Sequence, residues 1–508
     1  MSPATATLSS RRRWFALAIL MLAALLLSID GTVLALAVPA LTAGLSPSAE
    51  QVLWIGDIYS LALAGLLVLM GNLSDRFGRK RLLLTGSAAF GSASVLAAFS
   101  TTPEMLIAAR LLLGVAGAMV MPSTLSLIRN IFTDDAERTR AIALWATSFG
   151  AGSAIGPLTG GVLLEHFWWG SVFLINVPVM VIVLIGGAWL LPESKNPDPG
   201  RFDLLSAVLS IVSLTSTVFV IKHTVAEGMG AEAGAVALAA VATSVAFVRR
   251  QRRIDDPLLD LALFRYRSFS GAVVSSMIAL FALVGLLFFF SQYLQLGRGM
   301  TPLQAGLAEL PITVASIVVV IVISATVRSL GYGRTIATGL ALAAVGLGGV
   351  SLAAGSADYL WLAVVMVPIG LGLGLAMTVA ADVVLAAVPP RRAGAASAVT
   401  ETANELGVVL GISVLGSLMS LVYRHSLSLP DSIAGATRAT VEDSFASAVR
   451  VLAPGSPQLA GTREAFVDSV QATALVAAAA AGLAAVVAWR LIPSGRDVTA
   501  IDRAIDPA

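Results

Sequence analysis

The stretch LLLSIDGTVLAL, residues 25–36, is apolar except for one carboxylate, Asp30, and a few small or hydroxyl-bearing residues. It lies in an apolar run near residues 14–37, and a helix of about 20 such residues crosses a hydrocarbon layer of roughly 30 Å. A charge at mid-bilayer costs about 2.5 to 3.5 kcal/mol on insertion scales, so acids there usually face a polar cavity. The stretch therefore predicts a membrane helix with a functional acid.

The composition extends this prediction to the whole chain. Of 508 residues, 57% are hydrophobic and 12% are charged, whereas soluble domains carry about 25% charged residues. The net charge of +2, spread along the chain, does not indicate a nucleic-acid partner. The chain has no cysteine, only three widely separated histidines and no phosphate-binding G-x-x-x-x-G-K-[ST] loop. We therefore expect an integral membrane protein that is not an enzyme and that needs no metal or other cofactor.

Thirteen further apolar runs follow the first, so the sequence predicts fourteen membrane helices. The first run follows three arginines and is too long for a signal peptide, so we expect it to remain as a span. The predicted spans lie near residues 14–37, 51–71, 82–100, 105–128, 139–163, 170–191, 203–222, 233–248, 269–293, 306–327, 335–355, 360–387, 395–422 and 467–491.

The basic residues are distributed unevenly between the two sides. One side holds few: Lys222, Arg298 and four arginines of the segment 423–466. The positive-inside rule makes the richer side cytoplasmic, and an even number of spans places both termini there. Because arginine greatly outnumbers lysine, as in GC-rich bacterial sequences, we expect a bacterial cytoplasmic membrane. The richer side carries basic residues within 11–13, 76–81, 129–140, 195–201, 249–267, 328–334 and 391–392.

An internal repeat divides the chain. SDRFGRKRLLLTG at 74–86 has a faint echo in VRSLGYGRTIATG at 327–339, with both glycine pairs offset by 253 residues. Chance similarity between two glycine-containing loops is the alternative, but the offset also aligns several spans. We therefore predict an N-terminal six-helix bundle at 1–200, two extra helices at 201–255, and a C-terminal six-helix bundle at 256–508 with a long extracellular loop at 423–466.

Six motifs carry a family resemblance over nearly the whole chain. They are SIDGTVLALAVPAL (28–41), WIGDIYSLALAG (54–65), GNLSDRFGRKR (71–81), RLLLGVAGA (110–118), GAGSAIGPLTGG (150–161) and ETANELG (401–407). With them the chain resembles the fourteen-span drug:proton antiporters of the major facilitator superfamily, and among these the QacA-type multidrug exporters.

The resemblance implies an all-α membrane fold with two pseudo-symmetric six-helix bundles and two extra central helices. It also implies proton-coupled export of lipophilic and quaternary ammonium cations such as ethidium. The expected partners are organic cations, protons and membrane lipids, and the expected state is a monomer. An exporter of an endogenous lipid or metabolite on the same fold is the alternative.

Two of these motifs are expected to act as conformational gates. In the turn between spans two and three, Asp75 can accept hydrogen bonds from a helix N-terminus or from arginines across the bundle interface. In span five, small residues spaced by four allow close helix approach and a proline adds a kink, giving a contact on which the halves rock. Ordinary helix packing is the alternative there. The gate residues are Gly71, Asp75, Arg76, Gly78, Arg79, Gly152, Gly156, Pro157 and Gly160.

The acids within the spans are the predicted proton-coupling groups. Asp30 is expected to exchange a proton for the substrate, with Arg110 nearby; alternatively, the two only hold their helices together. Glu401 and Glu405 lie four apart and therefore share one helical face. Glu401 is the predicted proton carrier and Glu405 the predicted direct contact to the cation.

The substrate-binding candidates combine carboxylates with aromatic rings that can stack on cations. Asp57 is one of them, although an acid near a span end can instead extend towards the interface. The aromatic residues can alternatively face lipid or other helices. The full set is Asp30, Asp57, Glu405, Trp54, Tyr59, Trp145, Phe290, Tyr293 and Trp361.

Two segments limit the substrate range and the exit. The tenth span, LPITVASIVVV at 310–320, offers Ser316 and no carboxylate, which places export of dications in doubt. In the segment 423–466, SFASAVRVLA is expected either to form a helix or hairpin above the exit or to belong to a disordered loop.

Overall fold

The computed structural model describes residues 9–196, 203–228, 230–254, 257–388, 393–430 and 433–494. Within these ranges every regular element is helical, and fourteen spans are long and apolar enough to cross a membrane. The predicted count of fourteen is therefore confirmed. Of the basic positions used to orient the chain, 201, 391 and 392 lie outside the described residues.

The first six spans contact chiefly one another, and we call them the N-terminal set. Polar caps define where several of them begin: Ser48, Thr102 and Asp134 each accept a backbone N–H of the first helical turn. The set comprises α1 (Ser10–Leu45), α2 (Ala49–Phe77), α3 (Arg79–Ala98), α4 (Pro103–Ile131), α5 (Asp135–His166) and the broken sixth span, α6 (Ser171–Leu174) with α7 (Asn176–Leu190).

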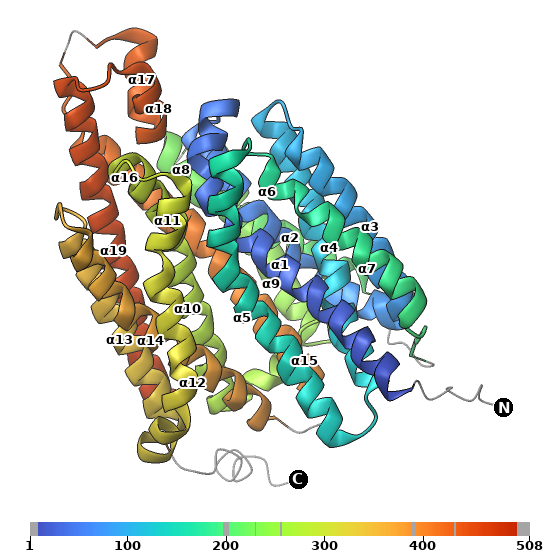
Figure 1. The fold of residues 1–508 in the computed structure, drawn as a ribbon. Coiled ribbons are helices and arrows are strands. Elements are labelled where there is room, and N and C mark those ends of the chain that lie inside the picture. Colours follow the sequence, from blue (N-terminus) through green and yellow to red (C-terminus); the bar gives the residue numbers. More distant parts are fainter. Residues whose placement is uncertain are drawn as a thin grey trace.

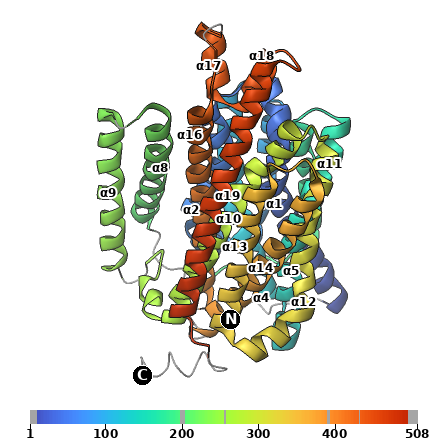
Figure 2. The same ribbon diagram turned by 90° about the vertical axis from the view of Figure 1, so that its left-hand side faces the viewer.

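Two helices, α8 (Leu204–Glu227) and α9 (Ala231–Gln251), stand as a pair beside the bundle (Figure 2). The helix α8 contacts α2 and α16, whereas α9 packs on α8. Asp203 caps α8 and accepts a bond of 2.9 Å from Arg250 near the end of α9. Burial alone would raise the pKa of Asp203, but the bonds from Arg250 and Ser206 hold it below the ordinary value. This ion pair therefore ties the two helices together at one end.

The remaining spans form what we call the C-terminal set. Two of them contain a π-helical turn, which carries one extra residue in the turn. The set comprises η1 (Leu261–Arg265), α10 (Arg267–Gln292) continued by the π-turn η2 (Tyr293–Gly297), α11 (Pro302–Ala308) with α12 (Leu310–Leu330), α13 (Tyr332–Ala353), α14 (Tyr359–Ala386), α15 (Ala393–Leu410) continued by the π-turn η4 (Gly411–Leu415) and α16 (Gly416–Ser426), and α19 (Pro457–Leu491).

Two short helices, α17 (Gly435–Asp443) and α18 (Phe445–Val451), cover one end of the bundle, which we call the cap end. The start of α1 and the finish of α19 lie at the other end, the terminus end (Figure 1). Phe445 stacks on Phe466 of α19 with ring centroids 4.7 Å apart. The helical alternative for SFASAVRVLA is therefore the observed one, and the connection is shorter than predicted because α16 ends at Ser426 and α19 begins at Pro457.

The cap joins both sets. The carboxylate of Asp443 accepts the backbone N–H of Ala49 at 3.1 Å, and Arg450 donates to the carbonyl of Thr42 at 3.2 Å. On the other side, Tyr423 of α16 donates to the carbonyl of Val441 at 3.0 Å. The cap therefore closes the space between the two sets at this end.

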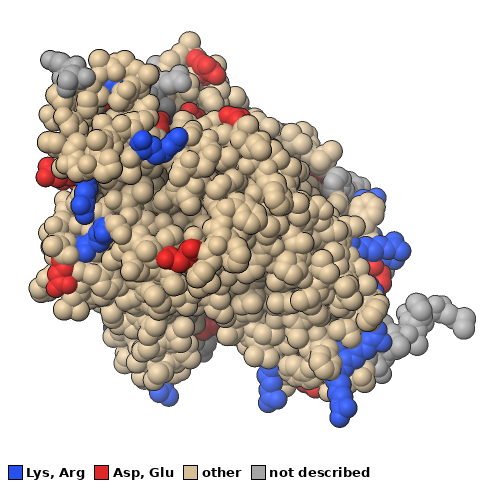
Figure 3. Space-filling model, turned by 45° about the horizontal axis from the view of Figure 1, so that its top comes forward, with Lys and Arg blue, Asp and Glu red and all other residues tan. Residues whose placement is uncertain are grey.

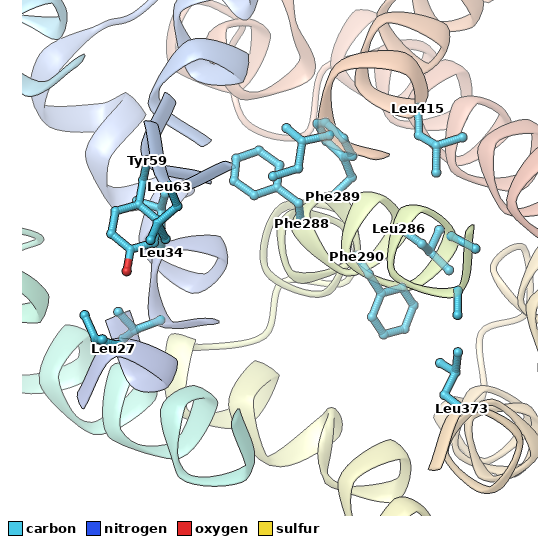
Figure 4. Close-up of a cluster of buried hydrophobic side chains, with 14 of the residues drawn as sticks. Leu27, Leu34, Tyr59, Leu63, Leu286, Phe288, Phe289, Phe290, Leu373 and Leu415 are labelled. Atoms are coloured by element: carbon cyan, nitrogen blue, oxygen red, sulfur yellow. The ribbon is translucent and has the colours of Figure 1, made fainter. Parts of the chain in front are cut away.

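The surface and the interior are both largely apolar. Only a few charged side chains interrupt the face shown in Figure 3. Inside, Phe288 and Phe289 of α10 lie between that helix and α2 (Figure 4). Phe288 reaches Gly56 so closely that a Cβ there would lie 2.8 Å from its ring. Large side chains of one set therefore fill the spaces left by glycine in the other.

Candidate functional site

Asp30 lies at the centre of a polar network inside the N-terminal set. Its side chain is fully buried, and its two oxygens accept bonds of 2.9 Å from Arg110 of α4 and 2.8 Å from Asn176 of α7. The guanidinium also donates to the carbonyl of Ile55 at 3.3 Å and lies 4.7 Å from the ring centroid of Tyr59. The structure thus brings Asp30 and Arg110 together as a sealed ion pair. This geometry fits the holding role, and the proton-coupling role stays a prediction.

Asp57 forms a second network, which crosses three parts of the molecule. One oxygen accepts a bond of 2.8 Å from Lys222 of α8, and the other accepts one of 2.6 Å from Ser413 in η4. The Lys222 ammonium also lies 3.7 Å from the ring centroid of Trp54. Asp57 therefore links α2 of the N-terminal set, the extra helix α8 and the C-terminal set.

The predicted position of Lys222 in an outer connection is wrong. The helix α8 continues to Glu227, and Lys222 is 2% exposed. The predicted span, 203–222, ends at Lys222 itself, and an unpaired lysine is strongly disfavoured within a membrane. The pairing with Asp57 compensates the charge and allows the helix to continue.

Glu401 and Glu405 lie one turn apart on α15, and both are half-buried. The helix α15 packs against α2, where Ser60 lies near Glu405. Two polar atoms beside them, Oγ1 of Thr402 and Oδ1 of Asn404, are buried without a hydrogen-bond partner. Polar groups therefore gather on α15 at the seam between the sets.

The aromatic candidates fall into two groups. Trp54 and Tyr59 each lie against a buried cation, Lys222 and Arg110 respectively. The structure does not bring the other four to these networks: Trp145 donates to Thr124 at 3.2 Å, Phe290 and Tyr293 are buried within the C-terminal set, and Trp361 is 61% exposed. Tyr293 donates to the carbonyl of Ala354 at 2.5 Å and accepts a bond from Arg298, which makes it part of the packing.

The turn between α2 and α3 is fixed within the N-terminal set. Asp75 pairs with Arg79, four residues on, at 2.8 Å. Gly78 has a φ of +115°, and a Cβ there would lie 2.6 Å from a carboxylate oxygen of Glu193. Arg76 is exposed, and Gly71 lies near Pro122 of α4. Among the described residues, the ion pair of Asp75 is thus with its own turn rather than with an arginine across the interface.

The glycine stripe of span five packs differently from the expectation. A Cβ at Gly152, Gly156 or Gly160 would meet α1, at Leu25, Thr32 and Val33 respectively. The contact with the C-terminal set is made instead by Pro157 and Gly161: a Cβ at Gly306 would lie 2.5 Å from the Pro157 carbonyl, and one at Gly161 would lie 2.9 Å from Leu303 of α11. The stripe therefore packs α5 against α1 within the N-terminal set, because glycines spaced by four residues let α1 approach this face of α5 closely.

A small cavity, partly open to solvent, lies below the cap, between the sets. Its lining includes Leu53 of α2, Ser420 and Tyr423 of α16, and Asp443 of the cap. Asp57 lies one helical turn beyond Leu53, away from the cap. No group of three or more His, Asp or Glu side chains in the described part of the chain is arranged to hold a metal ion.

Sequence reasoning missed four polar residues of these regions: Lys222, Asn176, Ser413 and Glu309. Glu309 is 7% exposed, and its Oε1 has no hydrogen-bond partner. It lies within the tenth span, which begins at Pro302, so the expectation that this span lacks an acid is wrong. The predicted span 306–327 already contains Glu309, and only the stretch 310–320 was read for acids. An isolated asparagine in an apolar run marked Asn176 in a similar way.

The sequence is similar to one protein family and to known proteins of drug efflux and drug resistance. The model of the Major Facilitator Superfamily matches residues 20–412. The chain is 43% identical to the multidrug efflux pump LfrA of Mycolicibacterium smegmatis, over 94% of this chain and 95% of that protein. It is 36% identical to the methyl viologen resistance protein SmvA of Salmonella typhimurium, over 90% of this chain and 94% of that protein.

The fold is also found among solved structures. A bacterial homologue of the human lysosomal transporter Spinster, in an inward-facing and occupied conformation, aligns with a TM-score of 0.67 at 15% identity. The alignment covers 96% of this chain and 99% of that one. At this identity the likeness concerns the fold alone.

Proposed function

Because the chain belongs to the Major Facilitator Superfamily and is a drug exporter of that superfamily rather than an enzyme, we propose that it exchanges protons for organic cations. The proposed cargo is lipophilic and quaternary ammonium cations of the ethidium and antiseptic type. The proton gradient is the proposed driving force, so no cofactor takes part. The single chain carries both helix sets, and it works as a monomer in this proposal.

The observation that carries the proposal is the pair of half-buried carboxylates on α15. Asp30 and Asp57 already have cationic partners, whereas no ion pair between described residues involves Glu401 or Glu405. An acid without such a partner can receive either a proton or a cation. Two ligands that compete for one site are linked reciprocally, which is the condition for exchange.

The proposed proton route connects the Asp30 network of the N-terminal set to α15. Glu401 carries the proton, and Glu405 contacts the cation. Arg110 stacks on Tyr59, and the next residue of α2, Ser60, lies near Glu405. Protonation of Asp30 would release Arg110 from its pair, and this contiguous series of contacts would carry the change to α15.

The cargo class is supported by chemistry and by one relative's name. Carboxylates beside aromatic rings favour cations. The Salmonella relative is named for resistance to methyl viologen, a molecule with two quaternary pyridinium nitrogens. Monovalent cations remain the principal expectation. The doubt about dications rested on a tenth span without an acid, and Glu309 removes that basis.

The proposed orientation places both termini in the cytoplasm of a bacterium and the cap outside. The basic turn with Asp75, Arg76 and Arg79 then lies on the cytoplasmic side. In this orientation the cavity below the cap is on the exit path, and the contacts of Asp443 and Arg450 with α1 and α2 must open for release.

Ethidium efflux from everted membrane vesicles tests the proposal. Wild-type protein should remove ethidium from the medium when a proton gradient is present and stop when an uncoupler collapses it. Glu405→Gln should weaken this activity, whereas Lys195→Met, which alters an exposed lysine, should not. Uphill export without any ion gradient would contradict the exchange. Competition by a zwitterionic lipid, with no competition by a quaternary ammonium compound, would instead favour a lipid exporter.

A further inference from the structure

One face of α2 carries an acid, an indole and a second acid in succession. Glu50, Trp54 and Asp57 are spaced at i, i+4 and i+7, so they lie along one side of the helix. The indole N–H of Trp54 donates to Glu50 at 3.3 Å. This arrangement offers two carboxylates to a cation, one on either side of an aromatic ring.

A cation from the protein itself occupies the inner part of this face. The ammonium of Lys222 lies 2.8 Å from Asp57 and 3.7 Å from the Trp54 ring centroid. A carboxylate together with an aromatic face is the chemistry that binds an alkylammonium or quaternary ammonium ion. The lysine therefore makes the contacts that a small organic cation would make.

The occupied position lies at the contact between α2, α8 and the C-terminal set, near the cavity. Ser413, which donates a hydrogen bond to the second oxygen of Asp57, belongs to a π-turn of the C-terminal set. Leu53, one turn nearer the cap on the same side of α2, lines the cavity. Ser420 of α16 also lines the cavity. Ser417 lies between Ser420 and Ser413 in the sequence, and its Oγ is buried without a hydrogen-bond partner. Small polar side chains thus lead from the cavity to Asp57.

A second position for the lysine is available. Glu50 and Lys222 contact the same indole: Glu50 accepts the Nε1–H of Trp54 at 3.3 Å, and the Lys222 ammonium lies 3.7 Å from the ring centroid. The lysine side chain is long and flexible, with a compact charged head. It can slide along the indole from one carboxylate to the other without losing its aromatic contact.

We propose that Trp54, Asp57 and Ser413 form a site for a monovalent organic cation, and that Lys222 is its tethered occupant, which the entering cation displaces towards Glu50. This inference rests on the proposed export of cations. It gives the extra helix α8 a role in transport, because α8 supplies the competitor. The lysine keeps Asp57 compensated whenever the site holds no substrate.

Binding of tetraphenylphosphonium to the purified full-length protein in detergent tests the inference. Lys222→Met removes the competitor, so the dissociation constant should fall about tenfold. The double variant Lys222→Met with Asp57→Asn should lose this gain. Lys195→Met, at an exposed lysine, serves as the matched control. An unchanged or weaker affinity of Lys222→Met, or a gain that persists in the double variant, would overturn the inference.

A second variant covers the case in which Lys222→Met does not fold. Glu50→Gln removes the fallback partner and leaves Asp57 and Lys222 in place, so displacement becomes harder and the dissociation constant should rise about threefold. An unchanged constant would count against the displaced lysine. Glu405→Gln separates the two proposals. If the wild type binds the cation and Glu405→Gln weakens this binding, the proposed function stands even when Lys222→Met leaves the dissociation constant unchanged.

Discussion

Asp30 and Asp57, the two paired acids of the N-terminal set, are equally buried, but their partners lie in different parts of the molecule. Every partner of Asp30, namely Arg110 and Asn176, belongs to its own set. The partners of Asp57 come from α8 and from η4 of the C-terminal set. The first network can persist while the sets move relative to one another. The second must break whenever α2 and η4 separate, so it reports the conformation of the whole molecule.

The comparison teaches that burial alone does not identify a moving charge. Both carboxylates are fully enclosed and paired with a cation at 2.8 to 2.9 Å. The two carboxylates differ in their surroundings: the partners of Asp30 belong to one helix set, whereas Asp57 lies where three parts of the molecule meet. Substitutions in the two networks should therefore differ in what they change, and four experiments test this difference.

The largest effect is expected for Asp30→Asn. It leaves Arg110 buried without a counter-charge, which should lower the free energy of unfolding by about 3 to 5 kcal/mol. Thermal unfolding of the purified protein measures this loss, and vesicle efflux of ethidium should fall with it. Adding Arg110→Gln should restore much of the stability but not the efflux. A fully active Asp30→Asn protein with unchanged pH dependence would remove Asp30 from proton coupling.

A smaller loss of stability is expected for Asp57→Asn. Lys222 loses its partner, but Glu50 is near, so the expected loss is about 2 to 3 kcal/mol, in the range for removing a hydrogen-bond partner from a buried charge. Lys222→Met in the same protein should restore stability, which thermal unfolding can follow. Equal losses for Asp57→Asn and Asp30→Asn would erase the distinction between the two networks.

Ser413→Ala probes the contact between the sets alone. It removes one hydrogen bond to a charged group, worth about 1.5 kcal/mol, and leaves the Lys222 pair intact. The chain has no cysteine, so Ser420→Cys in the cavity lining can be labelled selectively. Its labelling rate should rise about tenfold when the sets separate more easily. Ser417→Ala, whose Oγ has no partner, is the control and should label at the parent rate.

The smallest energetic effects are expected on α15. Among the described residues no ion pair involves Glu401 or Glu405, so neutral variants should change the free energy of unfolding by less than about 0.5 kcal/mol. Glu405→Gln should raise the KM for ethidium about fivefold, an effect of about 1 kcal/mol. Glu401→Gln should keep the KM and lose the pH dependence of efflux. A stability loss as large as that of Asp30→Asn would show that these acids are structural.

The fold was predictable because its signals are local. Each apolar run is read from about 20 consecutive residues, and all fourteen runs became spans. The ends of runs were less reliable, since a hydropathy reading stops at a charge. The predicted span 203–222 ended at Lys222, whereas the pairing with Asp57 lets α8 continue to Glu227. Glu309 lies inside the predicted span 306–327 but before 310–320, the stretch from which the lack of an acid was inferred.

The site was predictable by residue type but not by partner. Acids in apolar runs indicate polar function, so Asp30, Asp57, Glu401 and Glu405 were identified. Arg110 was paired correctly because the family motif contains it. The partners Lys222 and Ser413 lie 165 and 356 residues from Asp57, and no local pattern specifies such contacts. The direction of the glycine stripe depends likewise on which helix lies beside α5, which only the fold decides.

The π-turn at Gly411–Leu415 sits between the acids of α15 and the serines of α16. Because this turn holds one residue more than an α-helical turn, deleting a single residue there would leave a regular α-helical turn and keep the two halves of the span in nearly the same mutual orientation. Glu401 and Glu405 would then keep their direction, whereas the same deletion in the regular helix between Glu405 and the π-turn would rotate them by about 100° relative to α16. The π-turn is thus the point of this span at which a one-residue change of length leaves both acids facing the same helices.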